Sequence, residues 1–452
     1  MKLWKGRFSK AATSSADEFN ASIEFDQRLY KEDITGSIAH AKMLAKQGII
    51  PQEDADLIVK TLKEILADIE AGKVEFTIES EDIHMNIESI LTERIGDAGK
   101  KLHTARSRND QIAVDIRLYL KKEIAETDHI LGQLLDALAK LAKEIGTELF
   151  VVDDGWFGER HSTKDGLGDW YVNEGKFPNG LEELIKEVKN MNMKFGIWFE
   201  PEMVNPLTKL YKEHPDWIYQ FDNREGNLSR DQFVLNMTKP EVKEFVFNML
   251  DHYLTKYDID YIKWDANRPI SEPGAKNLGK QERSLWLKHI EAVYEIVDKL
   301  KEKHPNVLFE ACASGGGRID LGMLTHFDDF WTSDNTDAYD RLFIQNSYSH
   351  IYPIKAMRAW VTDCPNFLSK RVIPMEFRFD SSMMGTLGVG CNLLKLSEEE
   401  LNICKEKIAK YKEIRHIVQD GKFYRLQGNL VDNDYHIFEY VNKDEALLFV
   451  FL

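Results

Sequence analysis

The chain has 452 residues, 43% hydrophobic and 30% charged, which is typical of a soluble globular protein large enough for two or three domains. Its formal net charge of −17 argues against a broad nucleic-acid interface and against binding to an anionic membrane. No apolar segment approaches the roughly 18 residues of a membrane span, and the N-terminus lacks a signal-peptide core. The four cysteines form neither a C-x-x-C pair nor a zinc-ligand cluster. We therefore expect reduced thiols, a cytoplasmic location, and no membrane, nucleic-acid, metal or cofactor partner.

Residues 1–144 have the pattern of an all-α segment. A first predicted helix covers about residues 28–48, with Ile34, Ile38, Ala41 and Ala45 on one side. A second helix follows Pro51 and stops before Gly72, and its apolar face comprises Ala55, Ile58, Val59, Leu62, Ile65, Leu66 and Ile69. A third, longer helix is predicted over residues 111–145.

Residues 145–396 alternate between short apolar runs and helical stretches. The runs are "LFVV" (149–152), "KFGIWF" (194–199), "FVLNM" (233–237), "DYIKW" (260–264), "VLFEAC" (307–312) and "FWT" (330–332). Helical patterns cover residues 180–192, 240–257 and 281–303. Strands separated by helices of this length indicate a parallel sheet with helices packed on it. The predicted fold class is therefore α/β, with a (β/α)8-type barrel.

Several of the predicted strands end in polar residues. The texts are "VVDDGW", "WFEPE", "KWDANR", "EACASGGGR" and "WTSDNTD". In a (β/α)-barrel the carboxyl ends of the strands meet at one mouth, where active sites lie. Five strand ends of this kind predict an active site at that mouth.

Residues 397–452 have the pattern of a small, separate domain. A helix begins after Ser397, a plausible N-cap with Glu400 three residues on, and runs through "EEELNICKEKIAKYKEIRHIV". Three strands then follow, "KFYRLQ", "YHIFEYV" and "ALLFVFL". The sequence stops inside the last apolar strand, and since an unpaired hydrophobic edge invites aggregation, we expect a truncated β domain.

Two aspartates at predicted strand ends, Asp265 and Asp334, suggest glycoside hydrolysis. That reaction needs two carboxyl groups, which a retaining enzyme holds about 5–5.5 Å apart. We expect Lys263 to favour an ionised Asp265, and we expect the charge of a nearby nucleophile to raise the pKa of Asp334. Tryptophans beside these motifs suit stacking against sugar rings: Trp156, Trp170, Trp198, Trp264 and Trp331. The alternative is that the aspartates are loop or capping residues and the tryptophans are core.

From about residue 146 to 452 the sequence closely resembles the α-galactosidases of glycoside hydrolase family 36. The matching text is "ELFVVDDGWFG", "GDWYVNE", "MKFGIWFEPEMV", "DYIKWDANR", "EACASGGGRID" and "WTSDNTDA", although Ser314 departs from a glycine usual in the family. The resemblance implies retaining hydrolysis of terminal α-D-galactosyl groups from oligosaccharides, with Asp265 as nucleophile and Asp334 as acid/base. It also implies a set of substrate-binding residues: Asp153, Asp154, Trp198, Arg230, Lys263, Asn267, Cys312 and Gly315. Transglycosylation or α-N-acetylgalactosaminidase activity stays open within the family.

Residues 1–144 resemble the N-terminal part of argininosuccinate lyase. The matching text includes "LWKGRFSK", "FNASIEFDQRLYKEDITGSIAHAKMLAKQGI" and "EDIHMNIESILTERIGDAGKKLHTARSRNDQ". By this resemblance Ser107, Arg108 and Asn109 are the vestige of a site for a substrate carboxylate; from spacing alone they are also consistent with a capped helix start carrying surface charge. The family's catalytic histidine segment and its mobile serine loop are missing from this text, so we do not expect lyase activity.

The two resemblances meet near "LAKLAKEIGTELFVV". The β-sandwich and the first barrel strand of the α-galactosidase family have no counterpart here, so we expect seven of eight barrel strands and two exposed strand edges. We therefore predict three parts, 1–144, 145–396 and 397–452, with a catalytically inactive fusion of two enzyme fragments as the alternative to an α-galactosidase. The sequence leaves open whether the fusion is natural, engineered or mis-joined, and whether the chain forms a homo-oligomer.

Overall fold

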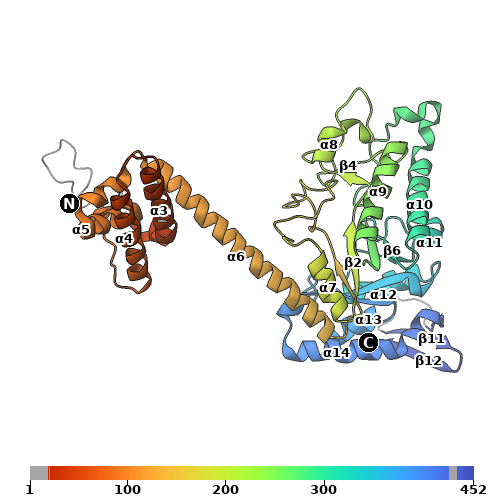
Figure 1. The fold of residues 1–452 in the computed structure, drawn as a ribbon. Helices are drawn as coiled ribbons and strands as arrows, with labels where there is room; N and C mark the ends of the chain where they lie inside the picture. The colour runs from red at the N-terminus through yellow and green to blue at the C-terminus, as the bar shows by residue number, and fades with distance from the viewer. Residues whose placement is uncertain (1–18, 20, 427–434) are drawn as a thin grey trace. The chain divides into compact units, whose positions relative to one another are not determined.

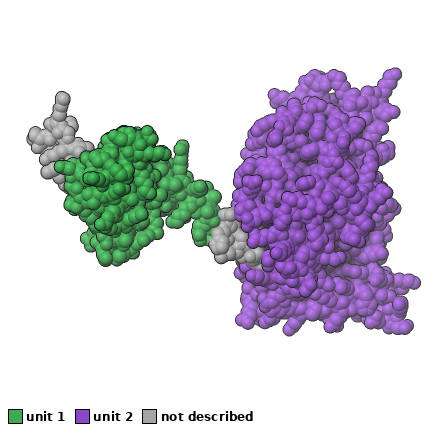
Figure 2. Space-filling view, in the orientation of Figure 1, with its two compact units in different colours: residues 1–130 green, residues 131–452 purple. Residues whose placement is uncertain are grey.

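The computed structural model describes residues 19, 21–426 and 435–452, so the predicted lyase-like motif at 3–10 lies outside the described residues. The chain divides into two compact units, residues 1–130 and 131–452 (Figure 2). The boundary falls inside helix α6 (Arg108–Glu144), and the two units are described separately below. None of the described helices is long and apolar enough to cross a lipid bilayer.

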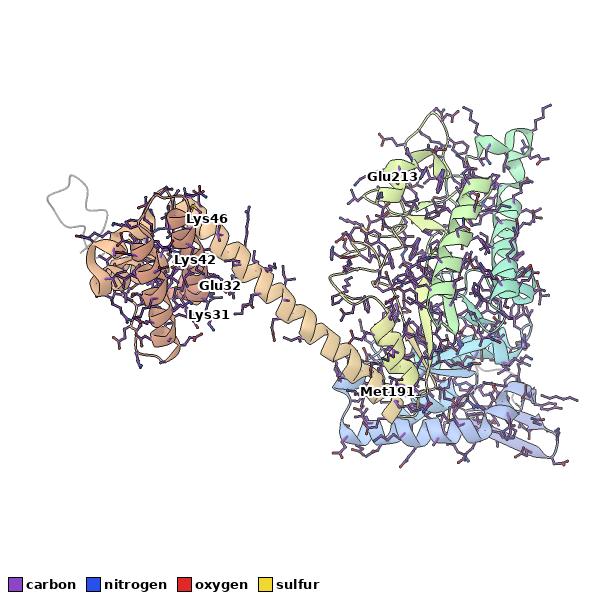
Figure 3. All side chains as sticks on the ribbon, viewed as in Figure 1. Lys31, Glu32, Lys42, Lys46, Met191 and Glu213 are labelled. Atoms are coloured by element: carbon purple, nitrogen blue, oxygen red, sulfur yellow. The ribbon has the colours of Figure 1, made fainter. Side chains whose placement is uncertain are left out.

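The first unit is helical, as the sequence predicts. It contains α2 (Ile23–Asp26), α3 (Tyr30–Lys46), α4 (Gln52–Glu70), α5 (Ile83–Ile95) and the start of α6, with 3-10 turns at Gln27–Leu29, Ile78–Ser80 and Gly96–His103. Its core is built mainly by α3, α4 and α5, through Ile34, Leu44, Ile58, Leu62, Ile65, Ile87 and Leu91. Lysines on α3 that Figure 3 labels, Lys31, Lys42 and Lys46, are exposed, so this helix separates an apolar face from a charged one.

The second unit is organised around a seven-stranded parallel sheet (Figure 1). Its strands, in spatial order, are β1 (Leu149–Val152), β2 (Lys194–Phe199), β5 (Tyr261–Trp264), β6 (Leu308–Ala311), β7 (Asp329–Trp331), β8 (Met357–Val361) and β9 (Thr386–Val389). The connecting helices are α7 (Glu182–Asn190), α9 (Pro240–Lys256), α10 (Leu285–Lys303), α11 (Leu321–His326), α12 (Ala338–Tyr348) and α13 (Met375–Ser382). Among the described residues the sheet has no eighth strand, so β1 and β9 are its edges.

One predicted barrel strand is wrong. The run "FVLNM" contributes only β4 (Phe233–Val234), which pairs antiparallel with β3 (Met203–Val204) in a separate two-stranded sheet. The extended stretch ends early because the side chain of Asn236 accepts the backbone N–H of Thr238 and bends the chain into a turn before α9. Helix α8 (Lys209–Glu213) lies in the same long excursion between β2 and β5.

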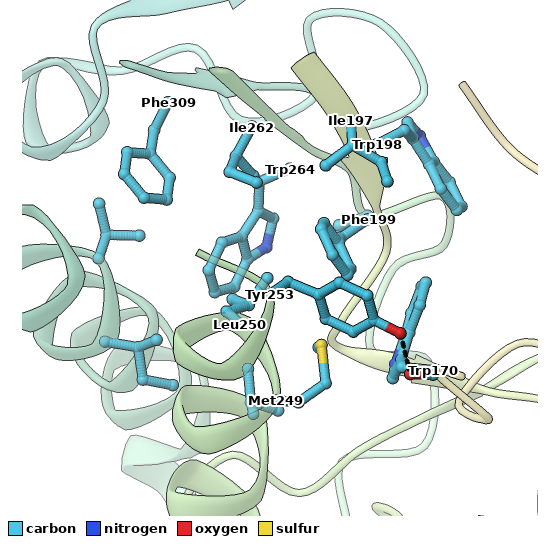
Figure 4. Close-up of a cluster of buried hydrophobic side chains, with 14 of the residues drawn as sticks. Trp170, Ile197, Trp198, Phe199, Met249, Leu250, Tyr253, Ile262, Trp264 and Phe309 are labelled. Carbon is cyan, nitrogen blue, oxygen red and sulfur yellow. Dashed lines mark hydrogen bonds between the residues drawn. The ribbon is translucent and has the colours of Figure 1, made fainter. Parts of the chain in front are cut away.

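An aromatic cluster fixes the position of β2 and β5 against α9 (Figure 4). The rings of Phe199 and Tyr253 lie 5.5 Å apart, and Phe199 and Trp170 lie 5.3 Å apart. The Tyr253 hydroxyl donates to the carbonyl of Trp170 at 2.7 Å, so its polar atom is satisfied within the apolar layer. The strands whose ends bear most of the polar residues are thus anchored by a dense core.

The C-terminal elements match their sequence pattern. Helix α14 (Glu398–Asp420) starts with the predicted capping box, in which Ser397 and Glu400 each accept the other's backbone N–H. The three predicted strands form an antiparallel sheet of β10 (Lys422–Arg425), β11 (His436–Asn442) and β12 (Glu445–Phe451). Tyr411 and Val418 of α14 pack with Phe438 and Tyr440 of β11.

Candidate functional site

The site lies at the carboxyl edge of the parallel sheet. Because all seven strands run in the same direction, the residues that follow them emerge on one side. The candidate site residues at or after these strand ends are Asp153, Asp154, Glu200, Glu202, Asp265, Asn267, Cys312, Gly315 and Asp334. Five strands contribute them, as the sequence predicts.

Asp265 is held rigidly just beyond β5. Its Oδ2 accepts from the Trp198 indole N–H at 3.1 Å and from the Asn267 amide at 2.7 Å. Its Oδ1 accepts the backbone N–H of Ala266 at 2.8 Å. Only 6% of the residue is exposed. Three donors to one carboxylate fix its orientation, and about one of its four acceptor positions remains free.

Lys263 pairs with Asp153 across the sheet. Its ammonium lies 2.7 Å from Asp153 Oδ2 and over the rings of Trp331 and Trp360 at 5.7 and 5.4 Å. Burial lowers the pKa of Lys263, but the charges of Asp153 and Glu310 outweigh burial and raise it, so the ammonium stays charged. Among the described residues, Lys263 therefore forms its ion pair with Asp153. It does not pair with Asp265, which lies two residues further along the chain.

Asp154 forms an ion pair with Arg160, which the sequence motifs did not mark as a site residue. The guanidinium Nε and Nη2 donate to Asp154 Oδ1 and Oδ2 at 3.0 and 2.9 Å, a two-pronged geometry that fixes the carboxylate plane. Arg160 is in turn anchored by the carbonyl of Asp165 at 2.9 Å. This arrangement leaves the Asp154 side chain partly exposed but oriented.

Two loops meet over Asn267. Arg230 donates to Asn267 Oδ1 at 3.2 Å and to the Ser314 hydroxyl at 3.0 Å. Arg230 and Asp231 both have positive φ, 53° and 59°, a conformation that non-glycine residues adopt only when neighbouring contacts hold them. Ser314, where the resemblance implied a glycine, thus has a specific hydrogen-bonding role.

Asp334 follows β7 and is exposed, and its Oδ1 accepts the Trp331 indole N–H at 2.8 Å. The loop after β6 comes very close to it: Gly315 has φ of +88°, and a Cβ there would lie 2.9 Å from the backbone N of Asp334. Only glycine allows this approach without a shift of the chain. The predicted residues Gly315 and Asp334 are therefore neighbours.

Cys312 lies among these residues, but its thiol is unreactive. The residue is buried, its backbone N–H donates to the Trp264 carbonyl at 2.9 Å, and burial raises the pKa of its thiol far above the usual range. A thiol of this kind is neither a nucleophile nor a metal ligand at neutral pH. Its contribution is to the shape of the site.

Two buried glutamates after β2, Glu200 and Glu202, were missed as functional residues. Glu200 accepts the backbone N–H of Asn267 at 2.6 Å and the Gln232 amide at 3.2 Å. Burial, and then the charge of Asp265, raises the pKa of Glu200 to about 8. The signal for both was the "WFEPE" strand end, where two carboxylates follow an apolar run.

Glu202 forms an ion network below the site. It accepts from the Trp264 indole at 2.6 Å, from His289 at 2.7 Å and from Arg318 at 2.7 and 3.0 Å. Burial by itself raises its pKa, but Arg318 and His289 outweigh burial and lower it to about 2. The network ties the ends of β2, β5 and β6 together.

In the first unit, the lyase-like residues mainly form contacts with other residues of the same unit. Ser107 Oγ accepts the backbone N–H of Asn109 at 3.2 Å, which is a helix-start contact at α6. Arg108 forms an ion pair with Asp82, the N-cap of α5. Ser107 and Asn109 are exposed.

The same unit holds a buried group that has ligand atoms for a metal ion, Asp33, His84 and Asp115. His84 Nδ1 lies 2.8 Å from Asp33 Oδ1 and 3.4 Å from Asp115 Oδ2. Burial, followed by the charge of Asp33, raises the pKa of Asp115 to about 7. The shorter contact is a hydrogen bond, whereas neither carboxyl oxygen of Asp115 has a hydrogen-bond partner among the described residues.

Two protein-family models match the chain. The model described as Melibiase matches residues 119–421, two thirds of the chain, and the model described as Lyase matches residues 6–148. The two ranges overlap over residues 119–148, around the join that the sequence indicates.

The curated relatives are α-galactosidases. "Alpha-galactosidase AgaA" of Geobacillus stearothermophilus is 40% identical over 316 residues, covering 70% of this chain and 43% of that protein. "Alpha-galactosidase 1" of Pediococcus pentosaceus is 39% identical, covering 69% of this chain and 43% of its own length. This chain thus spans less than half the length of these relatives.

Solved structures agree in fold. The glycoside hydrolase family 36 enzyme AgaA from G. stearothermophilus superposes with a TM-score of 0.68 at 40% identity, covering 70% of this chain and 44% of that one. Two variants of that enzyme, solved with raffinose and with stachyose, give the same TM-score at 38% identity and the same coverage.

Proposed function

This chain belongs to the melibiase family, and from that membership we propose that its second unit is a retaining glycosidase that removes terminal α-D-galactosyl groups from oligosaccharides. The observation that supports this most strongly is Asp265, a carboxylate fixed by three hydrogen-bond donors at a strand end of the barrel mouth. Relatives that bind raffinose and stachyose indicate the substrate class.

In the proposed first step, Asp265 attacks the anomeric carbon of the galactosyl group. The bond from that carbon to the glycosidic oxygen breaks, and Asp334 donates its proton to the departing oxygen. A galactosyl ester on Asp265 and a free alcohol result. In the second step Asp334 removes a proton from water, the water oxygen attacks the anomeric carbon, and the ester bond to Asp265 breaks, which releases galactose with its configuration retained.

The surrounding residues position the sugar. Asp153 and Asp154, held by Lys263 and Arg160, present carboxylate oxygens suited to sugar hydroxyls. Trp198 both holds Asp265 and provides a flat wall. Asn267, Arg230, Cys312 and Gly315 shape the opposite side, in the role that the family resemblance gives them.

Hydrolysis of a chromogenic α-galactoside by the full chain tests this function. We expect turnover, and an Asp265→Ala variant should lose at least about 1000-fold in kcat because the covalent route is closed. Asp222→Ala, which removes an exposed carboxylate paired with Lys276, is the matched control and should retain activity. Absence of turnover from a cooperatively folding sample would contradict the proposal and favour the inactive fusion.

The role of Asp334 has its own test. In Asp334→Ala, hydrolysis of a nitrophenyl galactoside should fall less than hydrolysis of raffinose, because nitrophenolate leaves without a proton and a sugar alkoxide does not. Equal losses on the two substrates would assign Asp334 a binding role instead.

A further inference from the structure

The two edges of the parallel sheet face a common cavity in the second unit. The cavity has a volume of about 490 Å³ and is lined by residues of both β1 and β9. Side chains of the central strands β2, β5, β6 and β7 are almost all buried, whereas every residue of β1 and β9 is only partly buried. The edges are thus exposed to this space and not to another strand.

The direction of the backbone groups in β1 follows from its pairing with β2. The N–H of Lys194 donates to the carbonyl of Glu148 at 2.8 Å, so residue 148 points its backbone groups at β2. Backbone groups alternate in direction along a strand, so Phe150 and Val152 also face β2. Leu149 and Val151 therefore aim their N–H and C=O groups into the cavity.

The same argument applies to β9. The N–H of Gly390 donates to the Val361 carbonyl at 2.8 Å, so even-numbered residues of β9 face β8. The odd-numbered ones face the cavity, and this is visible at Leu387, whose N–H donates to the Tyr411 hydroxyl at 3.3 Å. That leaves the carbonyl of Leu387 and both backbone groups of Val389 directed into the cavity.

The two walls of the cavity differ in polarity. On the barrel-interior side lie Tyr261, Glu310 and Arg358, and two buried atoms there have no hydrogen-bond partner among the described residues, Glu310 Oε1 and Arg358 Nε. Glu310 is only 1% exposed. On the outer side, Leu138 and Ala142 of α6, Ile145 just after it and Ile408 of α14 are apolar, while further along α14 the lining also includes Lys412, Arg415 and Gln419.

We propose that this cavity is a strand-addition site, which binds an extended segment of another polypeptide between β1 and β9. Backbone donors and acceptors on two facing edges fit an extended chain, because only that conformation offers backbone groups on both sides. Alternate side chains of the segment then contact the apolar part of the outer wall, beside α6, and the polar inner wall. The matching segment carries β-branched residues facing outward and asparagine or threonine facing inward, where Glu310 needs a donor and Arg358 an acceptor.

Residue-resolved amide hydrogen exchange on the full chain tests this site. The probe is an acetylated, amidated peptide of sequence Val-Asn-Val-Thr-Val, added in excess. We expect exchange at Leu149, Val151 and Val389 to slow at least tenfold, while Phe150 and Val152, already paired with β2, stay unchanged. The readout does not involve galactoside turnover, so it separates this site from the proposed function. No slowing in a folded sample overturns the proposal.

Two controls address the mechanism of binding. The same peptide with alternate amides methylated cannot donate to both edges and should give no protection; equal protection overturns the proposal. If protection of these amides rises with the concentration of the chain when no peptide is present, the cavity binds a second copy of this chain. That result also overturns the proposal.

Two variants remove the site by different routes. Val389→Pro deletes a cavity-facing N–H without removing a donor to β8, since proline is tolerated where the N–H faces away from the ladder. Ala142→Phe fills the cavity from the α6 side, and it serves if the proline variant does not fold. Each should abolish the protection at Leu149, and full protection in a folded variant overturns the proposal.

Discussion

Glu200 and Glu202 show how neighbouring carboxyl groups acquire opposite properties. Both are 1% exposed, but Glu202 faces Arg318 and His289, whereas Glu200 faces Asp265. The pKa of Glu202 accordingly falls to about 2 and that of Glu200 rises to about 8. At neutral pH the first is a structural anion and the second is a neutral acid beside the proposed nucleophile.

The raised pKa of Glu200 predicts a pH-dependent stabilisation by Glu200→Gln. The pKa of the Glu200 carboxyl is near 4.5 in the unfolded chain and about 8 in the folded chain. Its contribution to the free energy of unfolding therefore falls as the pH rises from 4.5 to 8. The variant is always neutral, and its new amide can donate to Gln232 Oε1, which lacks a partner. We expect little change in Tm at pH 4.5 and a rise of at least about 2 °C above pH 8.

Thermal melts at both pH values check this effect of Glu200. A difference in Tm between variant and parent that is the same at both pH values would contradict the assignment of a buried, protonated Glu200.

Gly315 predicts a local effect on activity. In Gly315→Ala the new Cβ meets the backbone at Asp334, so the loop carrying the proposed acid shifts and kcat should fall at least about tenfold. Gly279→Ala is the matched control, because Gly279 also has positive φ but has open space around it. Steady-state kinetics of both variants provide the check; equal kcat values would show that the close approach at Gly315 is not needed.

At the scale of elements, apolar runs predicted most of the fold. The strands at 149–152 and 194–199 have the predicted bounds, and the helices of the first unit follow their periodicity. β8 and β9 were not predicted. Arg358 interrupts the apolar residues of β8, and β9 contains Gly388, which packs against the Trp360 ring. Neither strand has the composition of a buried one.

The candidate site was predictable to the extent that its residues follow strands. Asp265 and Asp334 stand at such positions, and so does Glu200. The arginine partners of Asp154 and Glu202 were not predictable, because Arg160 and Arg318 lie on irregular loops and reach the site only through the folded chain. The partner of Lys263 was also unforeseen, since Asp153 is 110 residues away in sequence.

The capping box of α14 gives a prediction at this scale. Ser397→Ala removes the acceptor for the Glu400 N–H and should lower the free energy of unfolding by about 1 kcal/mol. Ser397→Thr keeps a hydroxyl and should change it little. Urea unfolding of the two variants measures the difference. An equal effect of both substitutions would show that the hydroxyl does not cap this helix.

At the scale of the whole molecule, α6 is where two families meet. The melibiase and lyase matches share residues 119–148, and α6 continues unbroken from Arg108 to Glu144. A helix rich in alanine, leucine, lysine and glutamate satisfies both patterns, since helix propensity depends little on the neighbouring fold. The proposed extent of the three parts, with boundaries near residues 144 and 396, stays a prediction.

The sheet of the second unit has open edges, yet the residues proposed for catalysis sit on its inner strands. Asp265 follows β5, the third strand in spatial order, and Asp334 follows β7, the fifth. One strand separates each of them from the nearer edge strand: β2 lies between β1 and β5, and β8 lies between β7 and β9. We therefore predict a working pair of carboxylates in a seven-stranded sheet.

Trapping of the covalent intermediate tests this account most directly. In a galactosyl fluoride with a second fluorine on the ring, the ring fluorine slows both formation and hydrolysis of the galactosyl ester. The anomeric fluoride is a good leaving group, so the ester still forms and then accumulates. The account predicts that the mass of the intact chain rises by one fluorogalactosyl group and that the label maps to Asp265 after digestion. A folded chain that acquires no label, or a label on any other residue, would contradict it.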